Sequence, residues 1–64
     1  MASFTLTIDM DNAVFEDDPG FMLAQLLAAL ATEVRDGSLR AGDSGNLRDP
    51  NGNTVGKYGW NPAP

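Results

Sequence analysis

Acidic side chains are concentrated in one short segment of this sequence. The segment DMDNAVFEDDPG, residues 9–20, holds five of the nine acidic residues of the 64-residue chain. These are Asp9, Asp11, Glu16, Asp17 and Asp18. Carboxylates can bind a metal ion, exchange protons with a substrate or attract a basic partner, so three kinds of site have to be compared.

A calcium loop of the EF-hand type does not fit the spacing. If Asp9 and Asp11 took the first and third ligand positions, glycine would be needed at the sixth position and glutamate at the twelfth. Val14 and Gly20 stand there instead. The chain also has no cysteine and no histidine, which removes thiolate and imidazole ligands. We therefore expect neither a metal ion nor a cofactor.

A second set of oxygen side chains occurs in DPNGN, where Asp49, Asn51 and Asn53 alternate. Proline at the second position and glycine at the fourth are typical of a type I turn. The turn explains these residues without a metal.

Paired catalytic carboxylates are the second kind of site. On a strand, Asp9 and Asp11 would project from the same face roughly 6–7 Å apart. A chain of this length leaves little room for an apolar pocket that would desolvate one of them. The serines have no histidine partner, and the glycines of AGDSGN lack the lysine of a phosphate loop. We expect no catalytic residues and no enzymatic activity.

A charged surface is the third kind of site. The net charge of −5 disfavours direct contact with nucleic acid or anionic lipid and favours a basic protein partner. Glu33 and Asp36 add acids near the predicted helix C-terminus, where the helix dipole disfavours them. B-DNA carries about one charge per 1.7 Å, a higher density than these acids reach, so we expect a partial DNA mimic. The alternative is that the charge serves only solubility.

The remaining sequence indicates one strand, one helix and a hairpin. Residues 3–10 alternate between apolar and polar types, as in a half-buried strand. Asp18 and Pro19 are typical of a helix start and Gly37 of a helix end, so the helix is placed at 19–36. Leucines at helical spacing form its apolar stripe. Residues 37–46 are expected to form a surface loop.

The sequence LRDPNGNTVGKY, residues 47–58, predicts a hairpin with a bulge at the glycine of its turn. Leu47 and Val55 are expected to face the core, with Thr54, Gly56 and Tyr58 on the opposite face. The predicted fold is α+β, in the order β-α-β-β, with one amphipathic helix on a three-stranded antiparallel or mixed sheet. We expect residues 1–60 to form a single small domain and residues 61–64 to form a frayed tail.

An alternative interface consists of large apolar residues outside the main helix stripe: Phe21, Met22, Tyr58 and Trp60. Such residues can anchor a partner or a homodimer, or they can complete a small core. In this alternative the protein is an accessory module that binds through the open sheet face, with Tyr58 and Trp60 as anchors.

The motifs FTLTIDMDNAVF and LRDPNGNTVG resemble those of a group of very small bacteriophage, prophage and host proteins. Their pattern is an F-x-L-x-I strand, a D-N-A-x-F turn, a leucine-rich helix and an L-R-D-x-N-G-N-x-V-G hairpin, which covers residues 4–58 here. The resemblance implies a mobile-element setting, in which small acidic proteins are often inhibitors of host defence, such as anti-CRISPR proteins. It assigns no catalytic residue.

These observations lead to one principal hypothesis. The chain is expected to be a phage-encoded, non-enzymatic inhibitor whose acidic face blocks a basic DNA-binding site, such as the PAM-reading site of a CRISPR effector subunit. The apolar run of residues 21–31 is shorter than the roughly 20 residues of a membrane span, and no signal peptide is recognised. We expect a monomer or weak homodimer in the host bacterial cytoplasm.

Overall fold

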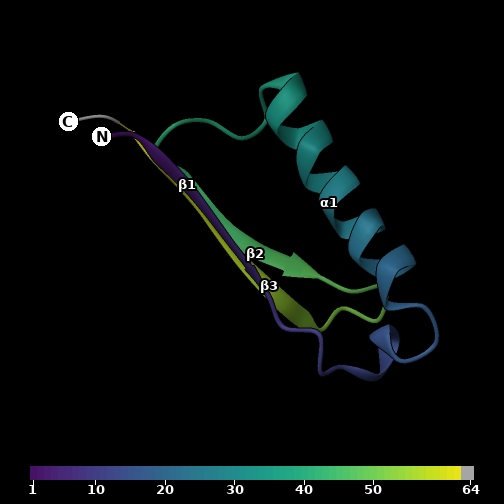
Figure 1. Ribbon diagram of the computed structural model, residues 1–64. Coiled ribbons are helices and arrows are strands. Elements are labelled where there is room, and N and C mark those ends of the chain that lie inside the picture. Colours follow the sequence, from purple (N-terminus) through teal and green to yellow (C-terminus); the bar gives the residue numbers. More distant parts are fainter. Residues whose placement is uncertain (63–64) are drawn as a thin grey trace.

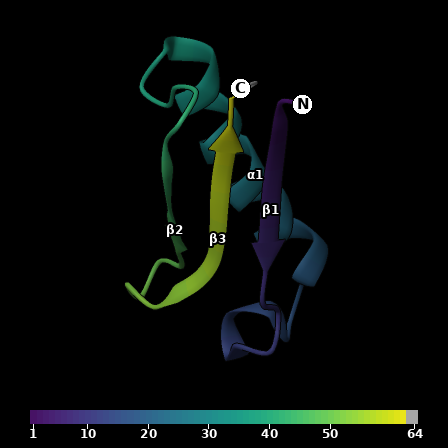
Figure 2. The same cartoon turned by 90° about the vertical axis from the view of Figure 1, so that its left-hand side faces the viewer.

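The computed structural model describes residues 1–62, which form one layer of strands and one helix (Figure 1). The elements are β1 (Ser3–Ile8), the 3-10 turn η1 (Ala13–Phe15), α1 (Pro19–Asp36), β2 (Ser44–Arg48) and β3 (Thr54–Asn61). The strands make a three-stranded antiparallel sheet in the order β1-β3-β2, and α1 lies across one face of it (Figure 2). The predicted α+β fold and its C-terminal hairpin are confirmed, and the sheet is antiparallel rather than mixed.

The pairing of β1 with β3 determines which residues face the helix. Phe4, Leu6 and Ile8 lie opposite Trp60, Tyr58 and Gly56. Directly opposite residues of an antiparallel pair share a face, so all six lie on the side covered by α1. The intervening threonines of β1 and Lys57 lie on the open face.

Helix α1 begins and ends where the sequence predicts. The Asp18 carboxylate accepts a hydrogen bond from the Phe21 N–H at 3.0 Å, which satisfies one of the free amides of the first turn. Gly37 terminates the helix with φ 85°, a conformation that side chains with a Cβ disfavour. Leu26 and Leu30 are the helix residues that become buried.

The hairpin is longer than predicted. The Gly52 N–H donates to the Asp49 carbonyl at 3.0 Å and Gly52 has φ 86°, as expected for a type I turn followed by a glycine bulge. However, β2 already begins at Ser44 and β3 continues through Trp60 to Asn61. The Trp60 N–H donates to the Asp43 carbonyl at 2.9 Å, which extends the pairing into the predicted loop. Residues 63–64 of the predicted tail lie outside the described residues.

An extra residue in β3, Val55, changes which side chains of the hairpin face the helix. Leu47 pairs with Gly56 and Arg48 with Thr54, so Val55 has no direct partner on β2. Such a bulge shifts the alternation of side chains by one position. Leu47 and Val55 are buried as predicted, but the prediction that Gly56 and Tyr58 face away from them is wrong, because both lie on the helix-covered face.

The connection from α1 to β2 contributes to the core, although the sequence predicts only a surface loop there. Leu39 is 4% exposed and packs with Leu30 and Leu47. Its N–H donates to the Glu33 carbonyl at 3.1 Å, so the chain folds back under the last helical turn. A single leucine in a Gly- and Ser-rich stretch has no periodicity that would have indicated this.

Replacement of Gly56 should reveal how closely β1 approaches β3. A Cβ at this position would come within 2.8 Å of the Thr7 carbonyl oxygen, a backbone atom that cannot rotate away. We expect Gly56→Ala to lower the free energy of unfolding by about 1–3 kcal/mol. Gly59→Ala, where the nearest atom is 3.7 Å away, serves as the control and should be neutral or stabilising in the same denaturation experiment.

The buried carboxylate of Asp49 should make stability depend on acidic pH. Burial raises its pKa, but hydrogen bonds from Asn53, Asn51 and Gly52 together lower the pKa below the ordinary value of 3.8. The stabilisation is therefore complete above pH 3.8 and is lost as the pH falls through the lowered folded-state pKa. Thermal melts should show that Asp49→Asn is less stable than the parent protein at neutral pH and that the difference narrows in acid. An equal difference at all pH values would contradict this assignment.

Candidate functional site

The acidic connection, defined by Asp9, Asp11, Glu16, Asp17 and Asp18, joins the end of β1 to the start of α1. The chain between these elements lies at one end of the molecule and includes η1 (Figure 1). All five side chains are exposed. The structure thus places these five acids along one exposed segment at this end of the molecule.

Two of these acids also fix the path of the chain. The Asp9 carboxylate accepts the Asp11 N–H at 3.0 Å, and the Asp18 carboxylate accepts the Phe21 N–H. Between them, the Asn12 side chain accepts the Val14 N–H at 3.0 Å and caps η1. Asp9 and Asp18 therefore both have structural roles. The sequence predicted such a role only for Asp18.

The other three acids, Asp11, Glu16 and Asp17, are exposed, and their carboxylates accept none of the side-chain hydrogen bonds found within residues 1–62. Residues 1–34 contain no lysine or arginine, so no basic residue within this part of the chain offsets their charge. The four basic residues all come later, at Arg35, Arg40, Arg48 and Lys57. Among these, Lys57 lines a surface depression together with Thr7 and Asp9, so one positive charge lies near the start of the acidic connection.

Glu33 and Asp36 do not join this group, because they lie at the far end of α1. The Asp36 carboxylate accepts a hydrogen bond from the Ser38 N–H at 2.9 Å. Hydrogen bonds from the Ser38 side chain and backbone lower the pKa of this carboxyl. Its position near the helix C-terminus thus has a structural reason that the sequence analysis did not recognise. Glu33 is exposed.

Neither the acidic connection nor the rest of the described chain gathers carboxylates for metal binding. Within residues 1–62, no three His, Cys, Asp or Glu side chains form a group that could hold a metal ion. The same residues include no helix with the length and apolar character needed to cross a membrane.

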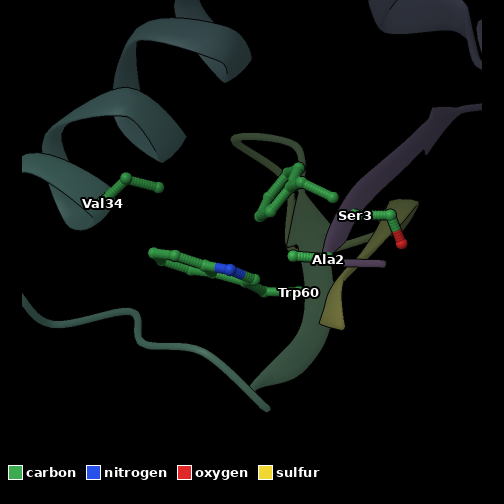
Figure 3. Close-up of a pocket in the computed structure, with 5 residues that line it drawn as sticks. Ala2, Ser3, Val34 and Trp60 are labelled. Carbon is green, nitrogen blue, oxygen red and sulfur yellow. The ribbon is translucent and has the colours of Figure 1, made fainter. Parts of the chain in front are cut away.

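A second feature is an apolar groove at the opposite end of the sheet (Figure 3). The ribbons of α1 and β1 diverge at this end (Figure 1). The groove is lined by Ala2, Ser3, Phe4, Val34 and Trp60 and has a volume of about 410 Å³. Val34 points from the helix toward the indole ring of Trp60 (Figure 3). Phe4 is 42% exposed and Val34 39% exposed, so the groove is open to solvent.

An aromatic cluster forms one wall of this groove. The ring of Phe4 stacks on Tyr58 at 6.3 Å with an interplanar angle of 8°, and meets Trp60 edge to face at 6.2 Å and 72°. Tyr58 also lies over Gly45, where an added Cβ would come within 2.6 Å of the phenol oxygen. Tyr58 and Trp60 therefore belong to the helix-covered face of the sheet, and the expectation that they lie on the open face is wrong.

The four residues of the predicted alternative interface do not form one surface. Met22 packs against the core cluster of Phe15, Leu26 and Val55, at the other end of the sheet from Trp60. Phe21 is 59% exposed in the first turn of α1. Sequence reasoning missed Phe4, because only the pairing of β1 with β3 brings it beside Tyr58 and Trp60.

The open face of the sheet is polar. Thr7, Lys57 and Asn46 form one row across the three strands. All three are exposed, and none supplies the large apolar area that usually anchors a protein interface.

Comparison with known proteins adds no family to these observations. No protein-family model, no curated protein and no solved structure matches this chain. The acidic connection and the apolar groove are therefore the two features that bear on function.

The division of the acids into structural and free carboxylates can be tested by alanine substitution. Asp18→Ala should lower the free energy of unfolding by about 1 kcal/mol, because the helix loses its N-cap acceptor. For a domain of this size that loss corresponds to a fall of about 4–8 °C in the melting temperature. Asp17→Ala removes the same charge from the neighbouring position and should change stability by less than about 0.5 kcal/mol. Equal losses would refute the division.

Proposed function

We propose that this protein is a non-enzymatic inhibitor of a host defence system and that its acidic connection occupies a basic nucleic-acid-binding site on another protein. In this role the connection acts as a partial DNA mimic. The observation that carries the proposal is the exposure of five carboxylates within residues 9–18, in the part of the chain that contains no basic residue.

The local geometry supports this role because the charges are held on an ordered framework. Hydrogen bonds at Asp9, Asn12 and Asp18 fix the chain on both sides of η1. A preorganised surface loses less conformational entropy on binding than a flexible acidic tail. Asp11, Glu16 and Asp17 are the carboxylates left for a partner.

The resemblance to small phage and prophage proteins is the reason for proposing a host defence system as the target. In such a setting, a suitable partner is a protein whose basic groove reads DNA, for example the PAM-reading site of a type I CRISPR effector in the bacterial cytoplasm. Lysine and arginine side chains that normally contact phosphates would contact the carboxylates instead. The charge density favours a block at one small site rather than along a long groove.

A second candidate function is that of a protein-interaction module that binds through the apolar groove. The observation in its favour is the exposed pair of Phe4 and Val34 beside the aromatic ring of Trp60. Aromatic anchors of this kind dominate the energetics of many interfaces. Binding through the groove would depend little on salt, which separates the two candidates.

The proposal predicts that charge reversal at the free carboxylates weakens partner binding without unfolding the protein. The protein should be captured with a partner from host lysate and then tested in competition with DNA for that partner. We expect Asp11→Lys, Glu16→Lys and Asp17→Lys together to reduce affinity by about tenfold or more, a change of at least about 1.4 kcal/mol. Binding of the parent protein should also weaken as salt increases.

The control is Glu33→Lys, a charge reversal at the far end of α1. It should leave binding nearly unchanged if the acidic connection is the contact. A triple variant that inhibits as well as the parent protein would contradict the proposal. A loss of binding in Val34→Lys, with no loss in the triple variant, would instead favour the apolar groove.

A further inference from the structure

The folded monomer leaves an unusually large surface exposed for its mass. Its accessible surface is 4534 Å², whereas a compact protein of 6.8 kDa exposes about 4,000 Å². Its radius of gyration is 12.6 Å, compared with about 11 Å for a compact domain of this length. The side of the molecule bounded by β1 combines unpaired backbone groups with exposed apolar side chains.

The outer edge of β1 has unpaired backbone groups. The Asp9 N–H donates to the Val55 carbonyl at 2.7 Å, which makes these opposite residues a hydrogen-bonded pair. Hydrogen-bonded and non-hydrogen-bonded pairs alternate along an antiparallel ladder, so Thr5 and Thr7 also bond to β3. The N–H and C=O groups of Phe4, Leu6 and Ile8 therefore point away from β3, toward the free edge.

This edge lacks the features that usually protect an edge strand. Ser3–Ile8 contains no charged residue, proline or bulge. The other edge, β2, has a register irregularity at Leu47 and Arg48 and an exposed arginine. The two edges of the same sheet thus differ, and β1 is the one suited to pairing with another strand.

The helix provides an apolar flank beside the same edge. Val34 lies on the β1 side, because it lines the groove with Ala2 and Phe4. Leu27 precedes Val34 by seven residues and Leu23 by eleven, so all three lie on this side of α1. Leu27 is 41% exposed and Val34 39% exposed.

The opposite side of α1 is more polar. There Thr32 and Glu33 lie near Asn46 and Arg48 of β2. Exposed apolar residues and unpaired backbone groups are therefore found together only along β1, within the described part of the chain.

We propose that a second copy of this chain covers this surface, with the two β1 strands paired antiparallel in one continuous six-stranded sheet. Pairing centred on Leu6 places Leu6 opposite Leu6 of the second copy, and Phe4 opposite Ile8. This register uses every unpaired N–H and C=O group of Phe4, Leu6 and Ile8. It also places Thr5 opposite Thr7 on the open face, a β-branched pair that suits neighbouring strands.

In this pairing the two copies are related by a two-fold axis perpendicular to the sheet. The axis also brings the apolar sides of the two α1 helices together. Both helices lie on one face of the joined sheet, and the Leu23, Leu27 and Val34 side of each faces its counterpart. Residues 19–32 carry no charge, so no buried ion is created there. The two acidic connections lie at opposite ends of the pair, because each follows the end of its own β1, and their mutual repulsion is small.

Sedimentation equilibrium over a range of concentrations tests this arrangement. We expect the parent protein to sediment at twice 6.8 kDa and to dissociate on dilution. Leu27→Lys should raise the dimer dissociation constant by about a hundredfold or more, because the axis places two like charges in one interface. Gln25→Lys, on the far side of the helix, should remain dimeric, and circular dichroism should show that both variants are folded.

Amide hydrogen exchange gives a second readout that does not depend on a substitution. The Leu6 amide should be protected in the dimer and should exchange rapidly on dilution and in Leu27→Lys, whereas the Thr7 amide stays protected in both states. The proposal is overturned if the parent protein is monomeric at the concentrations used for NMR. It is equally overturned if Leu27→Lys remains dimeric, or if β1 pairs only with a strand of a different protein.

Discussion

The antiparallel pairing of β1 with β3 is the constraint on which the rest of this structure depends. It joins the two ends of the described chain, so that the Asn61 side chain donates to the Ser3 hydroxyl across 58 positions of sequence. The pairing places Phe4 beside Tyr58 and Trp60 and makes β1 an outer strand. Because β1 ends beside the hairpin turn, the acidic connection must start at that end of the molecule and cross to the helix. The absence of a side chain at Gly56 leaves room for the Thr7 carbonyl of β1 at this point of the pairing.

The two candidate surfaces differ in how they are held. The acidic connection is shaped by short-range bonds, in which Asp9, Asn12 and Asp18 each accept an amide two or three residues ahead. The apolar groove is shaped by long-range packing of residues from β1, α1 and β3. A partner that binds the acidic connection would therefore meet a locally fixed surface, whereas the groove depends on the whole fold. The two surfaces lie at opposite ends of the sheet and can be altered independently.

Much of the fold could be predicted because its determinants are local. The alternation in residues 3–10, the Asp18 and Pro19 helix start and the Asp49 to Gly52 turn act over a few residues. Each produced the expected element, although β1 ends at Ile8 and not at residue 10. The facing of Tyr58 could not be predicted, because it depends on one extra residue at Val55 whose presence is decided by pairing with β2. The burial of Leu39 and the meeting of Phe4 with Trp60 are likewise results of tertiary packing. For the candidate site, the sequence indicated the acids but not which of them the backbone uses.

The central claim is that the free carboxylates of the acidic connection form the contact with a basic partner. Carboxyl labelling of the protein alone and in its captured complex, read residue by residue by mass spectrometry, tests it most directly. We expect Asp11, Glu16 and Asp17 to lose reactivity in the complex and Glu33 to keep it. Protection of Glu33 together with full reactivity of the acidic connection would contradict the claim.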